Sequence, residues 1–266
     1  PHLEIQRILG GALAQEGNFP WQALLLLPKS GLAGGILVSD RWVLTAAHVF
    51  WPKGGAARLP AERAREVRVL AGRVSIREME RAPGADRVER VVLHPGYRGD
   101  SPHFRHDLAL VRLGGRFKMA AGAMPGCLPP PTAPGLYRPG LAAFVSGWGV
   151  TENNTLLDRL RYVRLPLAEF GVCARAMADA QGGREPGQRS EVWPEGMVCA
   201  GTGIGGQDSC QGDSGGALAV RDAAEDRWYV IGVVSWGLGC GVPGTYGVYT
   251  RVSHYRAWID QEMARG

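Results

Sequence analysis

Short aliphatic and β-branched runs recur along this chain, and their spacing constrains its fold more than any other feature. The runs are bounded by Gly, Pro or Asp, which is typical of the strands of an all-β sandwich or barrel and not of alternating strand–helix units. A chain of 266 residues with 45% hydrophobic residues can bury a large core as one continuous unit. The sequence predicts strands at residues 22–27, 35–38, 67–71, 88–93, 108–113, 142–146, 161–165, 216–220, 228–236 and 247–252.

Charge and hydropathy exclude several classes of protein. The net charge is +5, but the basic residues are dispersed and nearly all are Arg, with Lys only at positions 29, 53 and 118. Because no basic run is interleaved with aromatic residues, we expect no nucleic acid partner. Apolar runs such as residues 23–27 are far shorter than the roughly 20 residues needed to cross a bilayer. No leader sequence opens the chain, so we expect a soluble fragment with no membrane insertion.

Residues 207–216, Gln-Asp-Ser-Cys-Gln-Gly-Asp-Ser-Gly-Gly, carry the strongest chemical signal. A serine hydroxyl is a weak nucleophile, so a hydrolytic Ser214 requires a base, a group that orients the base, and donors where an oxyanion forms. His48 follows an apolar run and two alanines that leave its imidazole room to reach a cleft, and Asp107 stands at the entry of a strand-like run. The order His, Asp, Ser is that of chymotrypsin-type barrels and differs from the order in subtilisin and the α/β-hydrolases.

Several further motifs carry a resemblance to a known family. The chain resembles the trypsin-like peptidase family from Ile8 to the C-terminus in the His48 and Asp107 segments and at residues 8–11, 19–22, 212–216 and 234–237. Within that family it is most similar to the complement-initiating proteases, the first-component and mannan-binding-lectin-associated serine proteases, at residues 18–22, 40–44, 219–222 and 246–250.

The resemblance implies a fold of two six-stranded antiparallel β-barrels with the active site in the crevice between them. The first barrel is expected at about residues 8–123 and the second at about 124–266, after an activation segment at residues 1–7. Periodic apolar residues at 253–264 predict one terminal amphipathic helix, with Ser253 as its N-cap.

The resemblance also assigns the catalytic roles. His48 is the general base that takes the Ser214 hydroxyl proton, and Asp107 fixes its tautomer and stabilises the imidazolium. The backbone N–H groups of Gly212 and Ser214 form the oxyanion hole.

Specificity is expected to depend on Asp208, six positions before Ser214, which the resemblance places at the floor of the primary pocket. A carboxylate there selects Arg or Lys before the scissile bond. Gly237 and Gly247 are the expected pocket walls, with Gln211 at the rim and Ser235 among the substrate-binding residues. The alternative is that Asp208 is an ordinary solvated acid on a loop.

Five cysteines are an odd number for a protein expected to be secreted. The resemblance pairs Cys173 with Cys199 and Cys210 with Cys240, and it implies that Cys127 bonds an upstream chain. The alternative for Cys127 is a buried, inert thiol. The bridge that usually encloses the catalytic histidine is missing, as in most complement-initiating proteases, because residues 33 and 49 are Ala and Val.

The chain is further expected to be a zymogen. Cleavage of Arg7–Ile8 would release an Ile8 ammonium that pairs with Asp213 beside Ser214. Asn153 begins an Asn-Asn-Thr sequon and is a candidate for glycosylation, with an unused sequon as the alternative.

No cofactor or metal is expected. His94, His103 and His106 lack a Cys or carboxylate cluster that would complete a zinc site, which favours surface loops. Arg73 stands after Gly72, where trypsin's calcium loop has a carboxylate.

Together these features predict a secreted serine endopeptidase that cleaves protein substrates after Arg or Lys in complement activation and is controlled by serpin-type inhibitors. One alternative is a trypsin-like protease of coagulation or another extracellular cascade. A second alternative is a catalytically inactive, protease-fold binding protein.

Overall fold

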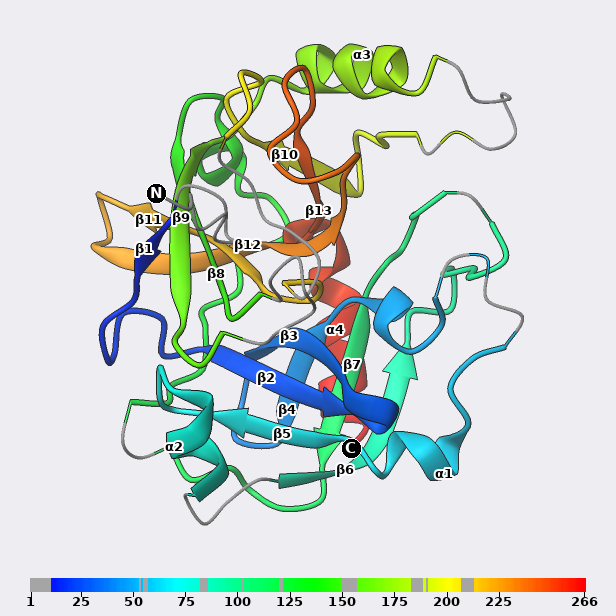
Figure 1. Cartoon of the computed structure of the whole chain (residues 1–266), viewed down its shortest axis with the longest axis vertical. Coiled ribbons are helices and arrows are strands. Elements are labelled where there is room, and N and C mark those ends of the chain that lie inside the picture. The colour runs from blue at the N-terminus through cyan, green and yellow to red at the C-terminus, as the bar shows by residue number, and fades with distance from the viewer. Residues whose placement is uncertain are drawn as a thin grey trace, which may run out of the picture.

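The computed structural model describes residues 11–52, 54, 57–81, 86–101, 103–119, 122–149, 157–182, 189, 191–206 and 213–266. Two β units stand one above the other in Figure 1, with the C-terminal helix behind them. The fold class predicted from the sequence is confirmed: the structure is mostly strands and ends in a helix. No helix among the described residues is long and apolar enough to cross a membrane.

The first unit is a closed barrel of six strands, all paired antiparallel. Neighbouring side chains on a strand point to opposite faces. In β4, Val43 packs inside the barrel while Leu44 packs in a second core outside it. Both faces are buried, which explains the uninterrupted apolar sequence of this strand. The strands, in barrel order, are β2 (Gln22–Leu27), β3 (Gly31–Leu37), β4 (Trp42–Thr45), β7 (Ala109–Leu113), β6 (Asp86–Leu93) and β5 (Arg68–Ala71).

The second unit is a seven-stranded sheet, so the expected count of six is corrected by one strand. The additional strand is β1, whose two residues pair with Tyr162 and Arg161 of β9. A bridge between Leu167, next to β9, and Ala200 of β10 joins the ends of the other six strands. The sheet order is β1 (Ala12–Leu13), β9 (Arg161–Pro166), β8 (Ala142–Gly147), β11 (Ala217–Asp222), β12 (Arg227–Trp236), β13 (Gly247–Arg251) and β10 (Met197–Ala200).

Helices cover the outside of both units. The predicted terminal helix is present as η5 and α4, but Ser253 does not cap it, because α4 begins after Tyr255 without a side-chain cap. Glu169 caps α3, which the sequence analysis did not predict, by accepting hydrogen bonds from the N–H groups of Gly171 and Val172. The helices are η1 (Pro28–Ser30), η2 (Ala47–Val49), α1 (Ala61–Ala64), α2 (Ile76–Arg81), η3 (Pro134–Tyr137), α3 (Phe170–Ala180), η5 (Val252–Tyr255) and α4 (Arg256–Ala264).

A shared apolar core holds the two units together. Leu44 and Leu110 of the first barrel pack in one cluster with Ala217 and Val233 of the second sheet. Ile259 of α4 is fully buried in the same cluster, so the terminal helix seals the contact between the units. Truncating such a residue to Ala typically costs about 2 to 5 kcal/mol, which makes the relative position of the two units a consequence of packing.

Candidate active site

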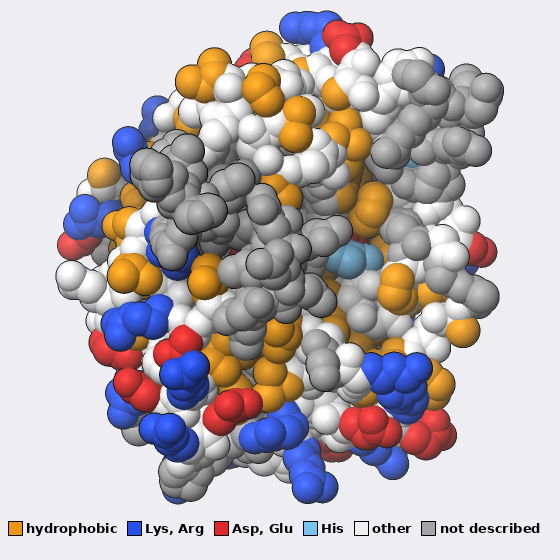
Figure 2. Space-filling view, in the orientation of Figure 1, with side chains coloured by type: hydrophobic (Ala, Val, Ile, Leu, Met, Phe, Trp, Pro, Cys, Tyr) orange, Lys and Arg blue, Asp and Glu red, His pale blue; other side chains and the backbone are white. Residues whose placement is uncertain are grey.

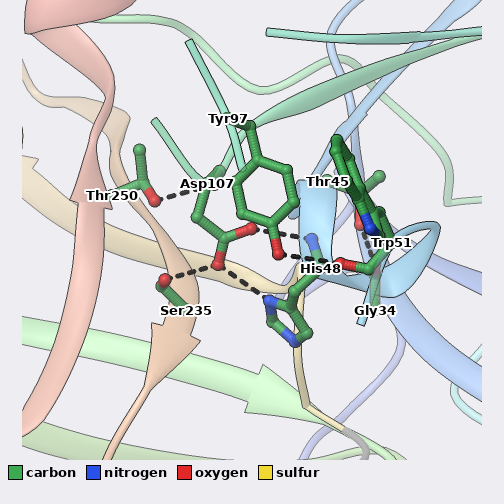
Figure 3. A network of polar contacts seen from close by, with 8 residues as sticks. All are labelled: Gly34, Thr45, His48, Trp51, Tyr97, Asp107, Ser235 and Thr250. Atoms are coloured by element: carbon green, nitrogen blue, oxygen red, sulfur yellow. Dashed lines mark hydrogen bonds and ion pairs between the residues drawn. The ribbon is translucent and has the colours of Figure 1, made fainter. Parts of the chain in front are cut away.

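Asp107 and His48 form the centre of the site (Figure 3). His48 lies in the short helix η2 that follows β4, and Asp107 lies two residues before β7, the strand paired with β4. The two side chains meet with 2.7 Å between His48 Nδ1 and Asp107 Oδ2. The backbone N–H of His48 donates to the other carboxylate oxygen at 2.8 Å. A donor at Nδ1 leaves Nε2 as the proton acceptor, which is the tautomer that a general base requires.

Asp107 is also held from the second unit. Ser235 of β12 donates its hydroxyl to Asp107 Oδ2 at 2.5 Å, and Thr250 of β13 donates to the Asp107 carbonyl at 2.8 Å (Figure 3). Asp107 is fully buried, and a buried carboxylate costs several kcal/mol unless it is paired and hydrogen-bonded. These donors supply that compensation, and they tie the site to both units at once.

Ser214 lies on a turn that packs against the first barrel. Its carbonyl accepts a hydrogen bond from Gly34 N–H at 2.8 Å, and the next residue, Gly215, donates to Val234. Gly215 has φ +86°, and a Cβ atom there would lie 2.0 Å from Thr45 Oγ1. Only glycine fits this position. The turn therefore sits against Thr45, three residues before His48, and the structure brings all three predicted catalytic segments to one place.

Asp213, beside Ser214, is a fully buried carboxylate. It packs against the backbone of Gly147, at the end of β8, where a Cβ atom would lie 1.9 Å from Asp213 Oδ1. Any side chain at position 147 would displace this carboxylate. The residues expected to act with Asp213 on activation, Arg7 and Ile8, lie outside the described part of the chain.

The expected specificity residues are only partly described. Gly237 directly follows β12 and Gly247 begins β13, its pairing partner, so the two glycines lie at the same end of one strand pair. Among the described residues, a Cβ atom at Gly237 would make ordinary van der Waals contacts with the Gly239 and Tyr246 carbonyl oxygens, at 3.6 and 3.9 Å. The other expected pocket residues, Asp208 and Gln211, lie outside the described residues, as do Gly212 of the expected oxyanion hole and the sequon residue Asn153.

Aromatic side chains complete the wall around His48, and the sequence analysis missed them. The Phe104 ring meets the His48 ring edge-on at 5.9 Å between centroids and stacks on Trp236 at 5.8 Å. Tyr97 is buried and donates its hydroxyl to the Trp51 carbonyl at 2.9 Å (Figure 3). Burial, and next the charge of Asp107, raise the pKa of Tyr97, so it stays neutral. Sequence proximity could have pointed to two of them, since Phe104 lies three residues before Asp107 and Trp51 lies three residues after His48.

His94 and His106 lie in loops, as expected, but their rings are half-buried and not at the surface, which corrects the sequence prediction. Their rings stack at 4.9 Å and contact Tyr255 and Trp258 of the terminal helices. Burial lowers the pKa of His94 to about 4, with further contributions from His106 and His254. Among the described residues, no group of three His, Cys, Asp or Glu could hold a metal ion.

One disulfide joins Cys173 to Cys199, the pair that the resemblance implies. Cys240 is also disulfide-bonded, and Cys210, its expected partner, lies outside the described residues. Cys127 is a free thiol, and it is exposed, so the buried alternative is wrong.

Comparison with known proteins agrees with the family resemblance seen in the sequence, along nearly the whole chain. The trypsin family model matches residues 8–259. Complement C1r-A subcomponent of Mus musculus is 39% identical over 264 residues, which are 99% of this chain and 35% of that protein. Complement C1r subcomponent-like protein of Homo sapiens is 38% identical over 99% of this chain and 50% of its own length. This chain thus spans about a third to a half of the relatives it matches.

Proposed function

Because this chain belongs to the trypsin family and is a serine endopeptidase, we propose that it cleaves polypeptides after Arg or Lys in a complement-type activation cascade. The observation that carries the proposal is the buried Asp107–His48 pair, held from both units, with the Ser214 turn packed against the strand that leads to His48. The inactive binding protein does not account for this arrangement, since binding alone needs no oriented base.

The reaction follows from the groups present. His48 Nε2 takes the Ser214 hydroxyl proton as Oγ attacks the substrate carbonyl carbon, and the carbonyl oxygen becomes an oxyanion. The N–H groups of Gly212 and Ser214 donate to that oxygen. His48 returns the proton to the leaving amine, the C–N bond breaks, and water then hydrolyses the acyl-enzyme by the same steps. Asp107 stabilises the imidazolium in each half of the reaction.

Specificity for Arg or Lys is assigned to Asp208, with Gly237 and Gly247 as walls that leave room for a long side chain and Gln211 at the rim. The position of both glycines at the same end of the β12–β13 pair supports this assignment. A guanidinium in a dry pocket needs an anion, and truncating one partner of a buried charge pair costs about 2 to 5 kcal/mol. We expect Asp208→Ser to lose cleavage after Arg by roughly a hundredfold or more. Unchanged kcat/KM on Arg substrates would contradict the assignment.

Activation by cleavage at Arg7–Ile8 is a further part of the proposal, with residues 1–7 as the activation segment and the protease domain starting at Ile8. The fully buried Asp213 carboxylate supports it, because that position next to Ser214 suits a buried partner cation such as an N-terminal ammonium. The Arg7→Gln variant is expected to remain a zymogen. Full activity from protein whose measured N-terminus is still Pro1 would exclude the switch.

The complement assignment comes from the relatives, two of which are named as C1r or C1r-like proteins. The protein is proposed to be secreted, glycosylated at Asn153, inhibited by serpin-type proteins and tied to an upstream chain through Cys127. The exposed free thiol of Cys127 suits an intermolecular disulfide. In non-reducing electrophoresis the activated full-length protein should keep both chains together, and the Cys127→Ser variant should release the catalytic chain.

An active-site label tests the proposed function directly. A fluorescent organophosphonate with Arg before the reactive phosphorus should label the activated protein at one site. The same reagent with Leu in that position should label it at least about tenfold more slowly, since Arg gains a charge pair. The Ser214→Ala variant is the matched control. Failure of both reagents to label the activated protein would show that catalysis is lost.

A further inference from the structure

A cavity of about 570 Å³ opens on the first barrel, between α1 and β6. Its inner wall is apolar and includes the side chains of Phe50, Leu59 and Val91, which are buried or half-buried. Exposed arginines border it, namely Arg58, Arg65 and Arg90. Figure 2 shows Lys and Arg side chains, with Asp and Glu among them, along the lower part of the molecule, over the first barrel. The cavity therefore combines an apolar interior with a charged rim.

The rim has an excess of positive charge. Among the described residues of the lining, Glu89 is the one acidic residue, and it already pairs with Arg41 at 3.5 Å and with Arg112. Arg58 donates to the Val91 carbonyl at 3.2 Å, and Arg90 lies over the Trp42 ring. Within the part of the chain that the structure describes, none of the three rim arginines has an acidic partner. The exposed Arg58 and Arg65 side chains can therefore bind carboxylates from outside, while the Arg90 guanidinium also contacts Trp42 and lies beside Gly266.

The cavity is continuous with the catalytic segment. Phe50 lies two residues after His48, and its N–H donates to Ala47 in the turn that carries His48. The Phe50 carbonyl accepts a hydrogen bond from Leu59 N–H at 2.7 Å, which holds the far wall to the same turn. An extended chain covers about 3.3 Å per residue. Because the cavity borders the segment that carries His48, we infer that a polypeptide bound at the active site can continue into it.

We propose that this cavity is a second binding site for the protein substrate, which holds an acidic segment with one apolar side chain. The inference rests on the proposed function, that the chain cleaves polypeptides. Carboxylates match the planar guanidinium forks of the rim, and the apolar side chain fills the interior. Exposed ion pairs contribute little by themselves, so the apolar contact supplies the anchor and the arginines select for acidic sequence. A sulfated polysaccharide would leave the apolar wall unused.

A binding measurement tests the site without relying on catalysis. The probe is a dye-labelled peptide of about twelve residues with Asp and Glu around a single Phe, and the protein is the Ser214→Ala variant. We expect saturable binding that is weakened about tenfold or more by the added triple substitution Arg58→Glu, Arg65→Glu and Arg90→Glu, and by high salt. Arg164→Glu is the matched control, since Arg164 is an exposed arginine on β9 of the second unit. A folded triple variant that binds as tightly as the control would overturn the site.

Cleavage then connects the site to the reaction. A peptide with a cleavable Arg and the acidic extension should show a lower KM than one with a neutral extension, and the triple variant should remove that advantage. A short Arg substrate should be cut equally by the wild-type and triple-variant proteins. If the short substrate is not cut at all, the proposed function is wrong, but the peptide-binding measurement still tests whether the cavity is a binding site. If heparin binds through these arginines and the acidic peptide does not, the site serves a polysaccharide and the proposal is wrong.

Discussion

His48 and His106 are both close to Asp107, His48 through a direct contact and His106 as its neighbour in sequence, but different groups face the two rings. His48 Nδ1 lies 2.7 Å from Asp107 Oδ2, and the His48 side chain is 18% exposed to solvent. His106 is the residue next to Asp107 in sequence, yet its ring stacks on His94 and meets Trp193 and Tyr255. The His48 ring thus faces a carboxylate, whereas the His106 ring faces other aromatic rings.

The difference shows that sequence proximity to the catalytic acid does not give a histidine catalytic character. Burial lowers the pKa of His106, and the charges of His254 and Arg105 add to the effect. A ring in such a cluster stays neutral and serves as packing. A partner anion brought by another segment decides whether a histidine acts as a base.

Asp107→Asn should produce the largest effect. The amide holds His48 in the wrong tautomer, and triads of this kind lose about ten-thousandfold in kcat on that change. The control is Asp40→Asn, which removes an exposed ion pair with Arg116 on the same barrel and should leave kcat unchanged. Steady-state kinetics on a short Arg substrate distinguish the two. A loss below tenfold for Asp107→Asn would mean that His48 does not depend on this carboxylate.

Ser235→Ala should give the next largest effect. The Ser235 hydroxyl donates to Asp107 Oδ2, the same oxygen that faces His48 Nδ1, so without it the carboxylate loses one of the groups that hold it in position. We expect kcat to fall by about tenfold, which corresponds to roughly 1.4 kcal/mol, with KM nearly unchanged. An unchanged kcat would show that Ser235 acts only as packing.

Replacing His94 should have a smaller effect, on the stability of the fold at acid pH. The pKa of His94 is about 4 in the folded protein against 6.5 ordinarily. Between those values the unfolded chain binds a proton that the folded chain does not, so the free energy of unfolding falls as pH drops from 6.5 to 4. His94→Gln should reduce the loss of Tm between pH 7 and pH 4.5, measured by calorimetry. An identical loss in both proteins would place the acid sensitivity elsewhere.

Tyr255→Phe should have the smallest effect. The Tyr255 hydroxyl lies 3.2 Å from His106 Nδ1, and losing one such hydrogen bond costs about 1 kcal/mol, or about 2 to 4 °C in Tm. The kcat value should stay the same, because the cluster stabilises the fold and His48 carries the chemistry. A matching fall in kcat would show that the His106 cluster also supports catalysis, so that the two histidines would no longer differ in role.

The local sequence pattern was sufficient to predict many of the strands. The runs at residues 22–27 and 161–165 became β2 and β9 with shifts of at most one residue, because apolar runs between turn residues have few other ways to become buried. The helix α3 was missed, since only Cys173 and Met177 among its residues are buried and its cap is a glutamate, a residue outside the usual cap preferences. The expected cap at Ser253 was wrong because the chain first forms the short helix η5.

The sequence by itself determined the family, the fold class and which His, Asp and Ser to consider, because each depends on residue types in short segments and on their order. Only the tertiary structure decided what surrounds Asp107. Ser235 and Thr250 are 128 and 143 residues away in sequence and reach it because β12 and β13 pack against the first barrel. The same packing gathered His94, His106 and His254 into one aromatic cluster and placed three arginines around one cavity. Such contacts depend on how two cores meet, and no local pattern encodes that.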